Sequence, residues 1–488
     1  MSESERHEEL VAQRIAKAER WRQRGADPYP ARVTRTHTAV EAAALANEAE
    51  TPEVTVAGRV TAMRAMGKLA FLDLTDGSGR IQVLLRRDAI GDEAFEALGD
   101  VDLGDFLGAT GKPIRSRTGE PTVEASGFTM LVKAIQPPPE KWHGIAEVEQ
   151  RYRQRYLDLM TNAEVRNIFT IRSRVIAAIR RFMEARGYLE VETPILHPQA
   201  GGAAAQPFVT HHNAIDRDLY LRLALELHLK RLLVGGFERV FEIGPIFRNE
   251  GSDSTHNPEF TMMEWYEAYS DYLAIAEMFE TMVSQVASEA VGTTTVPNPA
   301  GGTIELAAPW RRLTMRDALQ QYAGFDFESY RQTESLLSLY SERGLQPAPG
   351  ASWAKLLDDL VKHYVEPELV QPTFLMDYPV ELSPLAKRKP GEPGIVERWE
   401  PFIRNFELGN AYSELNDPVD QRRRFEEQLA AKAAGDEEAE QLDEDFLTAI
   451  EYGMPPAGGA GLGVDRLIMV LTGQRSIREV ILFPAMRS

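Results

Sequence analysis

The stretch FRNEGSDSTHNPEFTMMEWY, residues 247–266, places an acidic side chain inside an apolar strand pattern. The two-residue period of a strand puts Phe260, Met262, Glu264 and Tyr266 on one face. A carboxylate that loses its water costs several kcal/mol unless a positive or hydrogen-bonding partner meets it. We therefore expect a positive charge to meet Glu264, and we looked for its source in the rest of the sequence.

The segments on either side of the turn-rich middle of this stretch are predicted to pair. Residues 239–250 and 258–268 are expected to form antiparallel strands, with Arg248 and Glu250 on one face of the first strand. Such a surface offers an aromatic plate, a guanidinium group for a phosphate or carboxylate, and carboxylates for an ammonium group.

Composition indicates a large globular protein of two or three domains. The chain has 488 residues, of which 43% are hydrophobic and 26% are charged, and its net charge of −20 argues against indiscriminate nucleic-acid binding. The lack of cysteine excludes disulfides, thiolate metal sites and cysteine nucleophiles. Because neither an apolar signal region nor a run of about 18 apolar residues occurs, we expect a cytoplasmic protein without a membrane segment.

Residues 1–50 are predicted to be a basic helical extension. In VAQRIAKAERWRQR, five basic residues stand against one acid, and Val11, Ile15, Ala18 and Trp21 form the expected apolar stripe. This pattern fits two interpretations equally well, a local nucleic-acid footprint and an ordinary solvated helix.

Residues 51–136 alternate short strands with glycine turns, which predicts a five-stranded barrel of the OB type. A hairpin around residues 76–79 directs its aliphatic side chains inward and leaves Phe71 and Gln82 on the outer face. An outward phenyl ring beside an amide suits stacking on an unpaired base and recognition of its edge. A single exposed phenylalanine is, however, often incidental.

The rest of the chain predicts a linker and a large mixed α and β domain. Proline-rich residues 137–150 are the expected linker, and residues 151–488 the expected domain. A long amphipathic helix leads into YLEVETPIL, residues 188–196, which is predicted to be a strand. Residues 315–368 are expected to be a helical insertion, and residues 435–445 an exposed acidic stretch.

Two further stretches carry groups suited to phosphates and metal ions. GGAGLGVDR fails the spacing of a dinucleotide fingerprint, but a glycine turn that places Arg466 at the start of a helix suits a phosphate. ERWEPFIRNFELGNAYSELNDP sets Glu400, Glu407, Asn410 and Glu414 among aromatic residues and glycine. Paired carboxylates with no nearby His or Cys suit Mg²⁺ and a substrate phosphate.

The remaining chemistry is limited. The sequence has no Walker-type phosphate loop, and we find no Ser-His, Cys or Lys nucleophile arrangement. The pair His211-His212 is too short a pattern to predict a metal site, and one more acid, Glu226, lies in LALELHLKRLL. Positioning and electrostatics would therefore have to carry the rate, as expected for phosphoryl or adenylyl transfer.

These stretches resemble the motifs of the class II aminoacyl-tRNA synthetases. FRNEGSDSTHNPEFTMMEWY resembles the second motif, GAGLGVDRLIM the third, and the long helix with YLEVETPIL the first. Together with RYRQRYLDLM, GGFERVFEIGPIFRNEG, ELGNAYSELNDP and REVILFPAMR, they are similar to bacterial lysyl-tRNA synthetases over nearly the whole chain. The resemblance implies an α+β fold, with a helix-flanked antiparallel catalytic sheet and an N-terminal OB-fold barrel, and a homodimer formed through the first motif.

The resemblance also implies a role for each matching residue. Lysine would contact Gly202, Glu226 and Glu264 at its α-amino group, Asn410 at its carboxylate, and Tyr266 and Glu414 at its ε-ammonium group. ATP would be bound by Arg248, Glu250, His256, Phe260 and Arg466, of which Arg248 and Arg466 are the implied catalytic residues. Mg²⁺, with more than one ion per subunit, would be held by Glu400 and Glu407. The anticodon would be bound by Arg64, Phe71, Gln82 and Glu120.

The implied reaction is ATP-dependent activation of L-lysine to lysyl-adenylate, followed by transfer to the 3′ end of lysine tRNA. The cation expected beside Glu264 would then arrive with the substrate. An aspartyl- or asparaginyl-tRNA synthetase is an alternative, but an aspartate pocket would need basic side chains in place of Glu226, Glu264 and Glu414. A ligase that attaches lysine to a protein, which would lack the N-terminal barrel, and a non-catalytic RNA-binding paralogue are two further alternatives.

Overall fold

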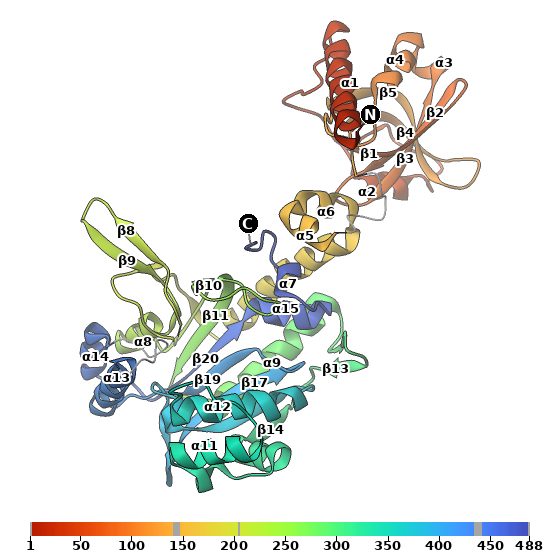
Figure 1. Cartoon of the computed structure of the whole chain (residues 1–488). Coiled ribbons are helices and arrows are strands. Elements are labelled where there is room, and N and C mark those ends of the chain that lie inside the picture. The colour runs from red at the N-terminus through yellow and green to blue at the C-terminus, as the bar shows by residue number, and fades with distance from the viewer. Residues whose placement is uncertain (1, 140–146, 204, 434–441, 487–488) are drawn as a thin grey trace. The chain divides into compact units, whose positions relative to one another are not determined.

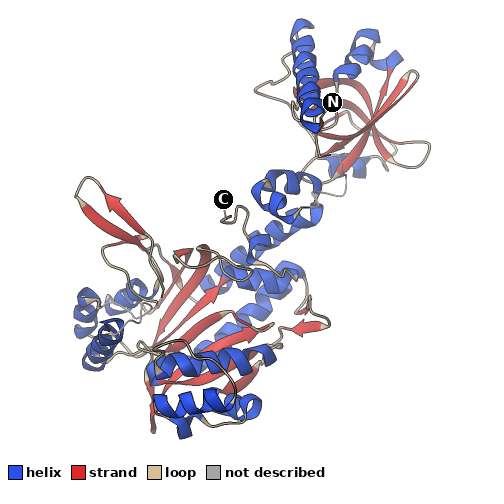
Figure 2. Cartoon of the chain, viewed as in Figure 1, coloured by secondary structure: helices blue, strands red, loops and turns tan. Residues whose placement is uncertain are grey.

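A computed structural model describes residues 2–139, 147–203, 205–433 and 442–486. The chain divides into two compact units, Met1–Trp142 and His143–Ser488, each with its own hydrophobic core. Figure 1 shows the elements of both units in chain order, and Figure 2 shows a β-rich N-terminal unit and a C-terminal unit of mixed helices and strands. No helix in the described ranges is long and apolar enough to cross a membrane.

Unit 1 is a closed five-stranded barrel with strand order β1-β2-β3-β5-β4, which confirms the OB-type prediction. The hairpin of β2 and β3 buries Ala70, Leu72 and Leu74 opposite Ile81 and Val83, as the alternating pattern predicts. The elements of this unit are α1 (Glu3–Gln23), α2 (Ala39–Leu45), β1 (Val54–Met66), β2 (Leu69–Thr75), β3 (Arg80–Arg86), α3 (Arg87–Ile90), α4 (Asp92–Ala97), β4 (Phe106–Arg115) and β5 (Pro121–Val132).

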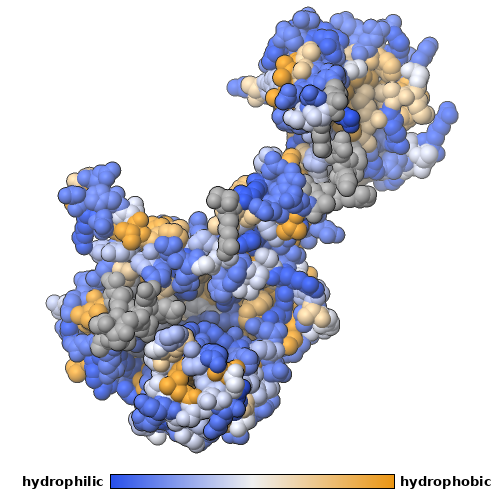
Figure 3. Space-filling view, viewed as in Figure 1, coloured by the Kyte–Doolittle hydropathy of each residue, from blue (hydrophilic) through white to orange (hydrophobic). Residues whose placement is uncertain are grey.

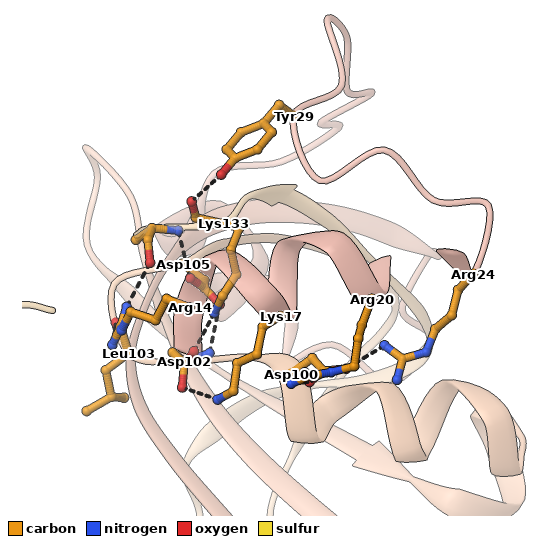
Figure 4. A network of polar contacts seen from close by, with 11 residues as sticks. Arg14, Lys17, Arg20, Arg24, Tyr29, Asp100, Asp102, Leu103, Asp105 and Lys133 are labelled. Carbon is orange, nitrogen blue, oxygen red and sulfur yellow. Dashed lines mark hydrogen bonds and ion pairs between the residues drawn. The ribbon is translucent and has the colours of Figure 1, made fainter. Parts of the chain in front are cut away.

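The basic residues of helix α1 bind the barrel of their own unit (Figure 4). Lys17 Nζ lies 2.6 Å from Asp102, and Arg20 and Arg24 both reach Asp100, at 2.5 and 2.7 Å. The predicted apolar stripe was partly wrong, because Ile15 is 52% exposed while Arg14, Ala18 and Trp21 are buried. Lys17, Arg20 and Arg24 therefore help to fix the helix on the barrel.

Unit 2 is built on a ten-stranded, largely antiparallel sheet with the order β14-β15-β17-β19-β20-β11-β10-β6 and two short strands paired to β17. Its strands are β6 (Leu189–Glu190), β10 (Arg239–Phe247), β11 (Glu259–Ala268), β14 (Arg311–Thr314), β15 (Thr373–Pro379), β16 (Arg388–Lys389), β17 (Glu392–Ile403), β18 (Phe406–Glu407), β19 (Gly409–Ser413) and β20 (Ala457–Gly463). Small separate sheets contain β7 (Leu196–His197), β8 (Val209–His212), β9 (Arg217–Leu221), β12 (Thr295–Pro297) and β13 (Thr303–Glu305).

Helices cover both faces of this sheet, because consecutive residues of β11 enter two different cores. Met263 and Trp265 pack into the core that contains α7 and α9, whereas Tyr266 packs into the core that contains α8, α11 and α12. The helices of unit 2 are α5 (Val148–Arg153), α6 (Arg155–Thr161), α7 (Ala163–Glu184), α8 (Glu226–Val234), α9 (Tyr272–Val291), α10 (Met315–Ala318), α11 (Thr333–Glu342), α12 (Trp353–Tyr364), α13 (Pro418–Ala433), α14 (Glu444–Glu451) and α15 (Val464–Thr472).

Three predictions about unit 2 were wrong in their extent. Strand β10 ends at Phe247, so Arg248 and Glu250 lie beyond the strand that was expected to carry them. YLEVETPIL forms a two-residue strand, β6, and its last residue belongs to β7 in another sheet, since Pro194 interrupts the pairing. The glycines of GGAGLGVDR lie in strand β20 and not in a turn, although Arg466 does begin helix α15.

The helical character predicted for residues 315–368 agrees with α10, α11 and α12. The predicted linker 137–150 and acidic stretch 435–445 fall partly on residues 140–146 and 434–441, which lie outside the described ranges.

Candidate functional site: a buried acidic chamber beside two arginines

Glycines of the central strand β20 open a trough between two strands that carry large side chains. Gly459 pairs with Tyr412 of β19 and Tyr266 of β11, and Gly461 pairs with Asn410 and Glu264 in the same two strands. A Cβ atom at Gly459 would lie 2.4 Å from a carboxylate oxygen of Glu414 and from the Tyr266 ring. Glycine is needed here for close approach, so the glycine motif packs against a cluster of buried acidic side chains, which we call the acidic chamber.

Three glutamates from different elements converge in this chamber. Glu226 begins helix α8, Glu264 lies in β11, and Glu414 directly follows β19, with exposed fractions of 7%, 4% and 1%. Lys230 lies one helical turn after Glu226, and its Nζ atom is 2.5 Å from Glu226 Oε1 and 2.5 Å from Glu414 Oε2. Tyr412 also donates to Glu226 Oε1, at 2.5 Å.

Glu414 keeps an unpaired oxygen in this arrangement. Among the described residues, no donor reaches its Oε1 atom, and its contact with Lys230 is a close ion pair without the angles of a directed hydrogen bond. An orphaned carboxylate oxygen in the interior costs free energy unless a ligand supplies a donor. The chamber is therefore built to accept a cationic hydrogen-bond donor.

Burial dominates the ionisation of these groups. It raises the pKa of Glu264 to about 7, with Glu226 adding to the rise, and the pKa of Glu414 to about 8 in spite of the opposing effect of Lys230. Burial alone would lower the pKa of Lys230, but Glu226 and Glu414 raise it above its ordinary value. The chamber therefore holds Lys230 as an ammonium, and Glu264 and Glu414 are poised to gain or lose protons near neutral pH.

Glu264, the acid that first indicated a site, is met by neutral donors. Leu225 N donates to Oε1 at 2.9 Å, and Tyr266 Oη donates to Oε2 at 3.0 Å. The positive charge that we expected beside it is not in direct contact among the described residues, since Lys230 pairs with the other two glutamates. That the cation of Glu264 arrives with the substrate stays a prediction, although the chamber already contains Lys230.

Arg248 lies at the other end of the site with part of its guanidinium group unpaired. Its Cζ atom is 5.3 Å from the centroid of the Phe260 ring, and its buried Nε atom has no hydrogen-bond partner within the described chain. Burial lowers the pKa of Arg248, while the charges of Glu250, Glu407 and Glu264 oppose this shift. Glu250 itself is exposed. A buried guanidinium with a free donor is suited to a phosphate or carboxylate oxygen.

The predicted phosphate ligands His256 and Arg466 lie together. Arg466 Nη2 is 3.2 Å from His256 Nε2, and Arg466 Nη1 donates to the carbonyl oxygen of Glu407 at 2.6 Å. Asp253 accepts from the other side of the His256 ring, at 2.9 Å. Burial would raise the pKa of Asp253, but hydrogen bonds from Thr255 and His256 lower it to about 2. These contacts place two basic side chains at the mouth of the turn between β10 and β11.

Glu400 and Glu407 form a pair of interacting carboxylates. Glu400 contacts Arg398 at 2.5 Å and accepts from Tyr378 Oη at 2.7 Å. Burial raises the pKa of Glu400 to about 7, and the negative charge of Glu407 raises it further while Arg398 opposes the rise. Two carboxylates that repel each other suit a divalent cation, and Mg²⁺ commonly takes one or two carboxylates and completes its shell with phosphates and water. No cluster of three or more metal-binding side chains occurs among the described residues.

Asn410 and Gly202 complete the set of predicted lysine ligands. Asn410 Oδ1 accepts from Arg398 Nε at 2.9 Å, which leaves its amide NH₂ group available to a ligand. Gly202 has φ +83°, and a Cβ atom there would lie 3.4 Å from Ala224, at the start of helix α8. Gly202 therefore lies near the start of the helix that carries Glu226. Asn410 and Glu264 lie on either side of β20, where both are paired with Gly461.

Of the predicted anticodon residues in unit 1, Phe71 and Gln82 lie in the hairpin of β2 and β3, Arg64 lies in β1, and Glu120 directly precedes β5. Arg64 and Phe71 are directly opposite each other in β1 and β2. Gln82 was expected to be exposed, but it is 8% exposed because its Oε1 atom accepts from Thr122 at 3.0 Å. Glu120 pairs with Arg80 at 2.5 Å.

Sequence reasoning missed Lys230, Tyr412 and Arg398, which hold the acids of the site. The spacing of Lys230 four residues after Glu226 in a leucine-rich helix was a usable signal for a buried pair. No comparable signal identified Arg398 as the partner of both Asn410 and Glu400, because that contact depends on the register of β17 against β19.

Comparison with known proteins agrees with this geometry. Residues 147–487 match the family described as tRNA synthetases class II (D, K and N), and residues 54–131 match the OB-fold nucleic acid binding domain. The chain is 54% identical over 487 residues to a lysine–tRNA ligase of Dehalococcoides mccartyi, with 98% of each chain covered. It is 52% identical over 483 residues to that of Moorella thermoacetica, with 99% of each covered, and 51% identical over 483 residues to that of Roseiflexus sp., with 98% of this chain and 99% of the relative covered.

Proposed function

The chain belongs to the lysine–tRNA ligases of the class II tRNA synthetase family, and from this membership we propose how its residues carry out the reaction. It is an aminoacyl-tRNA synthetase that activates L-lysine with ATP and joins it to lysine tRNA. The observation that best supports our assignment is that the site contains one buried acceptor without a donor and one buried donor without an acceptor. A buried carboxylate oxygen of Glu414 lacks a donor, and a buried nitrogen of Arg248 lacks an acceptor.

Lysine carries an ε-ammonium group at the end of its side chain, and an α-ammonium group and a carboxylate together on its α-carbon. We assign its ε-ammonium group to Glu414 and Tyr266, and its α-amino group to Glu226, Glu264 and Gly202. Its carboxylate is assigned to Arg248 and Asn410, each of which has a polar group free to donate. This placement gives a cationic donor to the unpaired oxygen and an anion to the unpaired guanidinium nitrogen.

ATP is assigned to the region between the two hairpin strands and helix α15. Phe260 stacks on the adenine ring, Glu250 accepts from its amino group, and His256 and Arg466 bind the outer phosphates. Glu400 and Glu407 hold Mg²⁺, which when bound offsets the negative charge of the phosphates.

In this arrangement the lysine carboxylate attacks the α-phosphorus of ATP, and the bond to pyrophosphate breaks. Arg248 contacts both the carboxylate and the α-phosphate, so it aligns the reacting atoms and stabilises the charge that develops on the phosphate. In the second step the terminal ribose hydroxyl of the tRNA attacks the carbonyl carbon and AMP leaves.

We assign anticodon binding to the outer face of the barrel, through Arg64, Phe71, Gln82 and Glu120. Replacing Phe71 with alanine should remove a base-stacking contact worth about 1–3 kcal/mol. Charging of lysine tRNA should then weaken while lysine-dependent pyrophosphate exchange stays near normal. Equal loss of both activities would mean that Phe71 supports folding and not tRNA binding.

The family membership and the exposed apolar surface of unit 2 support a homodimer. The family membership also supports a cytoplasmic location. Leu189, Ile195 and Leu196, in the first-motif region, are 47%, 40% and 45% exposed. The view in Figure 3 shows hydrophobic residues gathered beside the β8–β9 hairpin. Exposed apolar surface of this kind suits a second copy of the chain, and light scattering would test the expected mass.

The decisive experiment is ATP–pyrophosphate exchange driven by each of the twenty amino acids in turn. Lysine alone should support efficient exchange, because only its side chain brings an ammonium group to Glu414. Exchange driven best by aspartate or asparagine would overturn the assignment of the chamber. Absence of exchange with every amino acid would support a non-catalytic RNA-binding role.

A further inference from the structure

Lys230 is a buried charged group that the proposed reaction does not use. Its side chain is fully buried, and it bridges Glu226 and Glu414, the acids assigned to opposite ends of the substrate. The Nζ atom also lies 5.2 Å from the centroid of the Tyr412 ring and 6.0 Å from that of Tyr266. A lysine ammonium in a site for lysine needs an explanation, because it occupies acceptors that the substrate could use.

The balance of charge in the chamber explains the presence of Lys230. With all three acids ionised, as a bound dication would favour, Glu226, Glu264 and Glu414 contribute three negative charges, and Lys230 reduces the total to two. The neighbouring Glu242, opposite Glu264 in β10, is already neutralised by Arg222 at 2.5 Å. The two remaining charges match the two ammonium groups of the substrate, whose carboxylate is assigned to Arg248. A third uncompensated charge would instead take up a proton.

Lys230 also fixes the orientation of the Glu226 and Glu414 carboxylates. Both donors to Glu226, Lys230 and Tyr412, bind its Oε1 atom, and Lys230 contacts only Oε2 of Glu414 within the described chain. The Oε1 atom of Glu414 is thereby left without a donor. One ammonium thus fixes the rotation of two carboxylates and determines which oxygens face the substrate.

We propose that Lys230 is a resident counter-ion, a positioning residue that favours the charged form of Glu414 and orients both Glu226 and Glu414 so that the chamber fits a diamino acid. This inference rests on the proposed lysine site. The groups that face Lys230 are Glu226 of its own helix, Glu414 and Tyr412 from β19 and its end, and Tyr266 of β11, with Glu264 acting on Glu414. Lys230 acts through these groups and does not touch the reacting atoms.

The test replaces Lys230 with methionine in the full-length protein, which keeps the stem and removes the charge. The kcat/KM for lysine should fall about tenfold or more at neutral pH. In the profile of kcat/KM against pH, the acidic limb should move to higher pH by about one unit or more. The KM for ATP should change little. An equal fall at every pH, or an equal rise in KM for ATP and lysine, would mean that Lys230 only supports packing and would overturn the proposal.

A second variant covers the case in which the single change prevents folding. Combining Lys230→Met with Glu226→Gln restores two negative charges, so the acidic limb should return toward that of the unaltered protein although activity stays reduced. A double variant with the pH profile of the single variant would contradict the counter-ion role. Lys355→Met is the matched control, because Lys355 pairs with Asp359 four residues away at 3.2 Å on a more exposed helix face.

Thermal unfolding without amino acid or ATP separates this proposal from the proposed function. Between pH 6 and 9, the deficit of Lys230→Met relative to the unaltered protein should grow as pH rises, since the carboxylates lose protons with no internal cation. Lys355→Met should show no such trend. If the unaltered protein fails lysine-dependent exchange, the proposed function fails, yet this unfolding series still decides the counter-ion role. A deficit that does not change with pH would overturn that role.

Discussion

Each unit of the molecule buries a lysine between two carboxylates, and the two clusters differ in how fully they are satisfied. In the barrel, Lys133 Nζ lies 2.5 Å from Asp102 and 2.7 Å from Asp105 (Figure 4). Each of the four carboxylate oxygens there has a donor, because Lys17 binds Asp102 while Ala134 N and Asp102 N bind Asp105. In the chamber of unit 2, Glu414 Oε1 has no donor from the described residues.

The difference separates a structural cluster from a binding cluster. A saturated buried network stabilises one conformation, whereas an unsaturated one carries a free-energy cost that a ligand can relieve. Both contain acids with raised pKa values, since burial raises the pKa of Asp105 as it does those of Glu264 and Glu414. A raised pKa therefore does not distinguish the two lysine clusters, but the unpaired oxygen of Glu414 does.

The largest effect is expected from breaking the saturated cluster. Lys133→Met leaves Asp102 and Asp105 buried without their cation, which should destabilise the barrel by about 3–5 kcal/mol. Hydrogen exchange of barrel peptides in the full-length chain would measure the loss. Lysine-dependent pyrophosphate exchange should persist, because the barrel takes no part in adenylation. Lys112→Met, at an exposed position of β4, is the control and should change neither property. Loss of exchange activity with an intact barrel would contradict the contrast between the clusters.

Breaking the unsaturated cluster should affect substrate choice most. Glu414→Gln keeps the shape and removes a charged partner of the ε-ammonium group, an effect of about 2–5 kcal/mol, so kcat/KM for lysine should fall roughly 30-fold or more. Discrimination against norleucine should narrow, and ATP affinity should change far less. Pyrophosphate exchange with both amino acids, and titration with ATP, would measure this. Glu427→Gln, at an exposed position of α13, is the matched control. Collapse of ATP binding with lysine preference intact would place Glu414 at the metal site.

The chamber should also respond to pH near neutrality. The pKa values of Glu264, about 7, and Glu414, about 8, are raised above their ordinary value, so the folded protein retains protons that the unfolded chain has lost. Stability of the ligand-free protein from these groups is greatest below pH 5 and falls as pH rises toward 8, by up to about 1.4 kcal/mol per unit and group. Lysine binding favours the ionised acids, so its affinity should rise over the same range. Calorimetric titration from pH 6 to 8.5 would show this with proton release, and a flat affinity would contradict it.

The smallest effect is expected at the edge of the saturated cluster. Lys17 and Asp102 are about one-fifth exposed, and Asp102 keeps Lys133 when Lys17 is replaced. Lys17→Met should therefore cost about 0–1 kcal/mol, as is usual for solvent-accessible pairs. Hydrogen exchange of the same barrel peptides would measure it. A loss of stability as large as that of Lys133→Met would mean that the network acts as one unit. The contribution of each ion pair would then not depend on its exposure.

Much of the molecule could be predicted from local sequence pattern. The alternation of Ala70, Leu72 and Leu74 determined the barrel hairpin, and the 3.6-residue pattern of residues 163–184 determined helix α7. The period of two also placed Glu264 and Tyr266 on one face of β11, where Tyr266 donates to Glu264. These features depend on neighbours within a few residues, so the sequence alone was sufficient. The motif resemblance added the family, which the comparisons confirmed.

Tertiary structure alone decided how the acids are satisfied. Glu414 meets Lys230, and Asn410 meets Arg398, through strand registers and helix placement that no local pattern encodes. The glycines of β20 looked like a phosphate turn, and only their position between β11 and β19 shows that they make room for Glu414 and Tyr266. Desolvation depends on everything packed around a group, so whether an acid ends in a saturated network or an open chamber is a property of the fold and not of its own stretch of sequence.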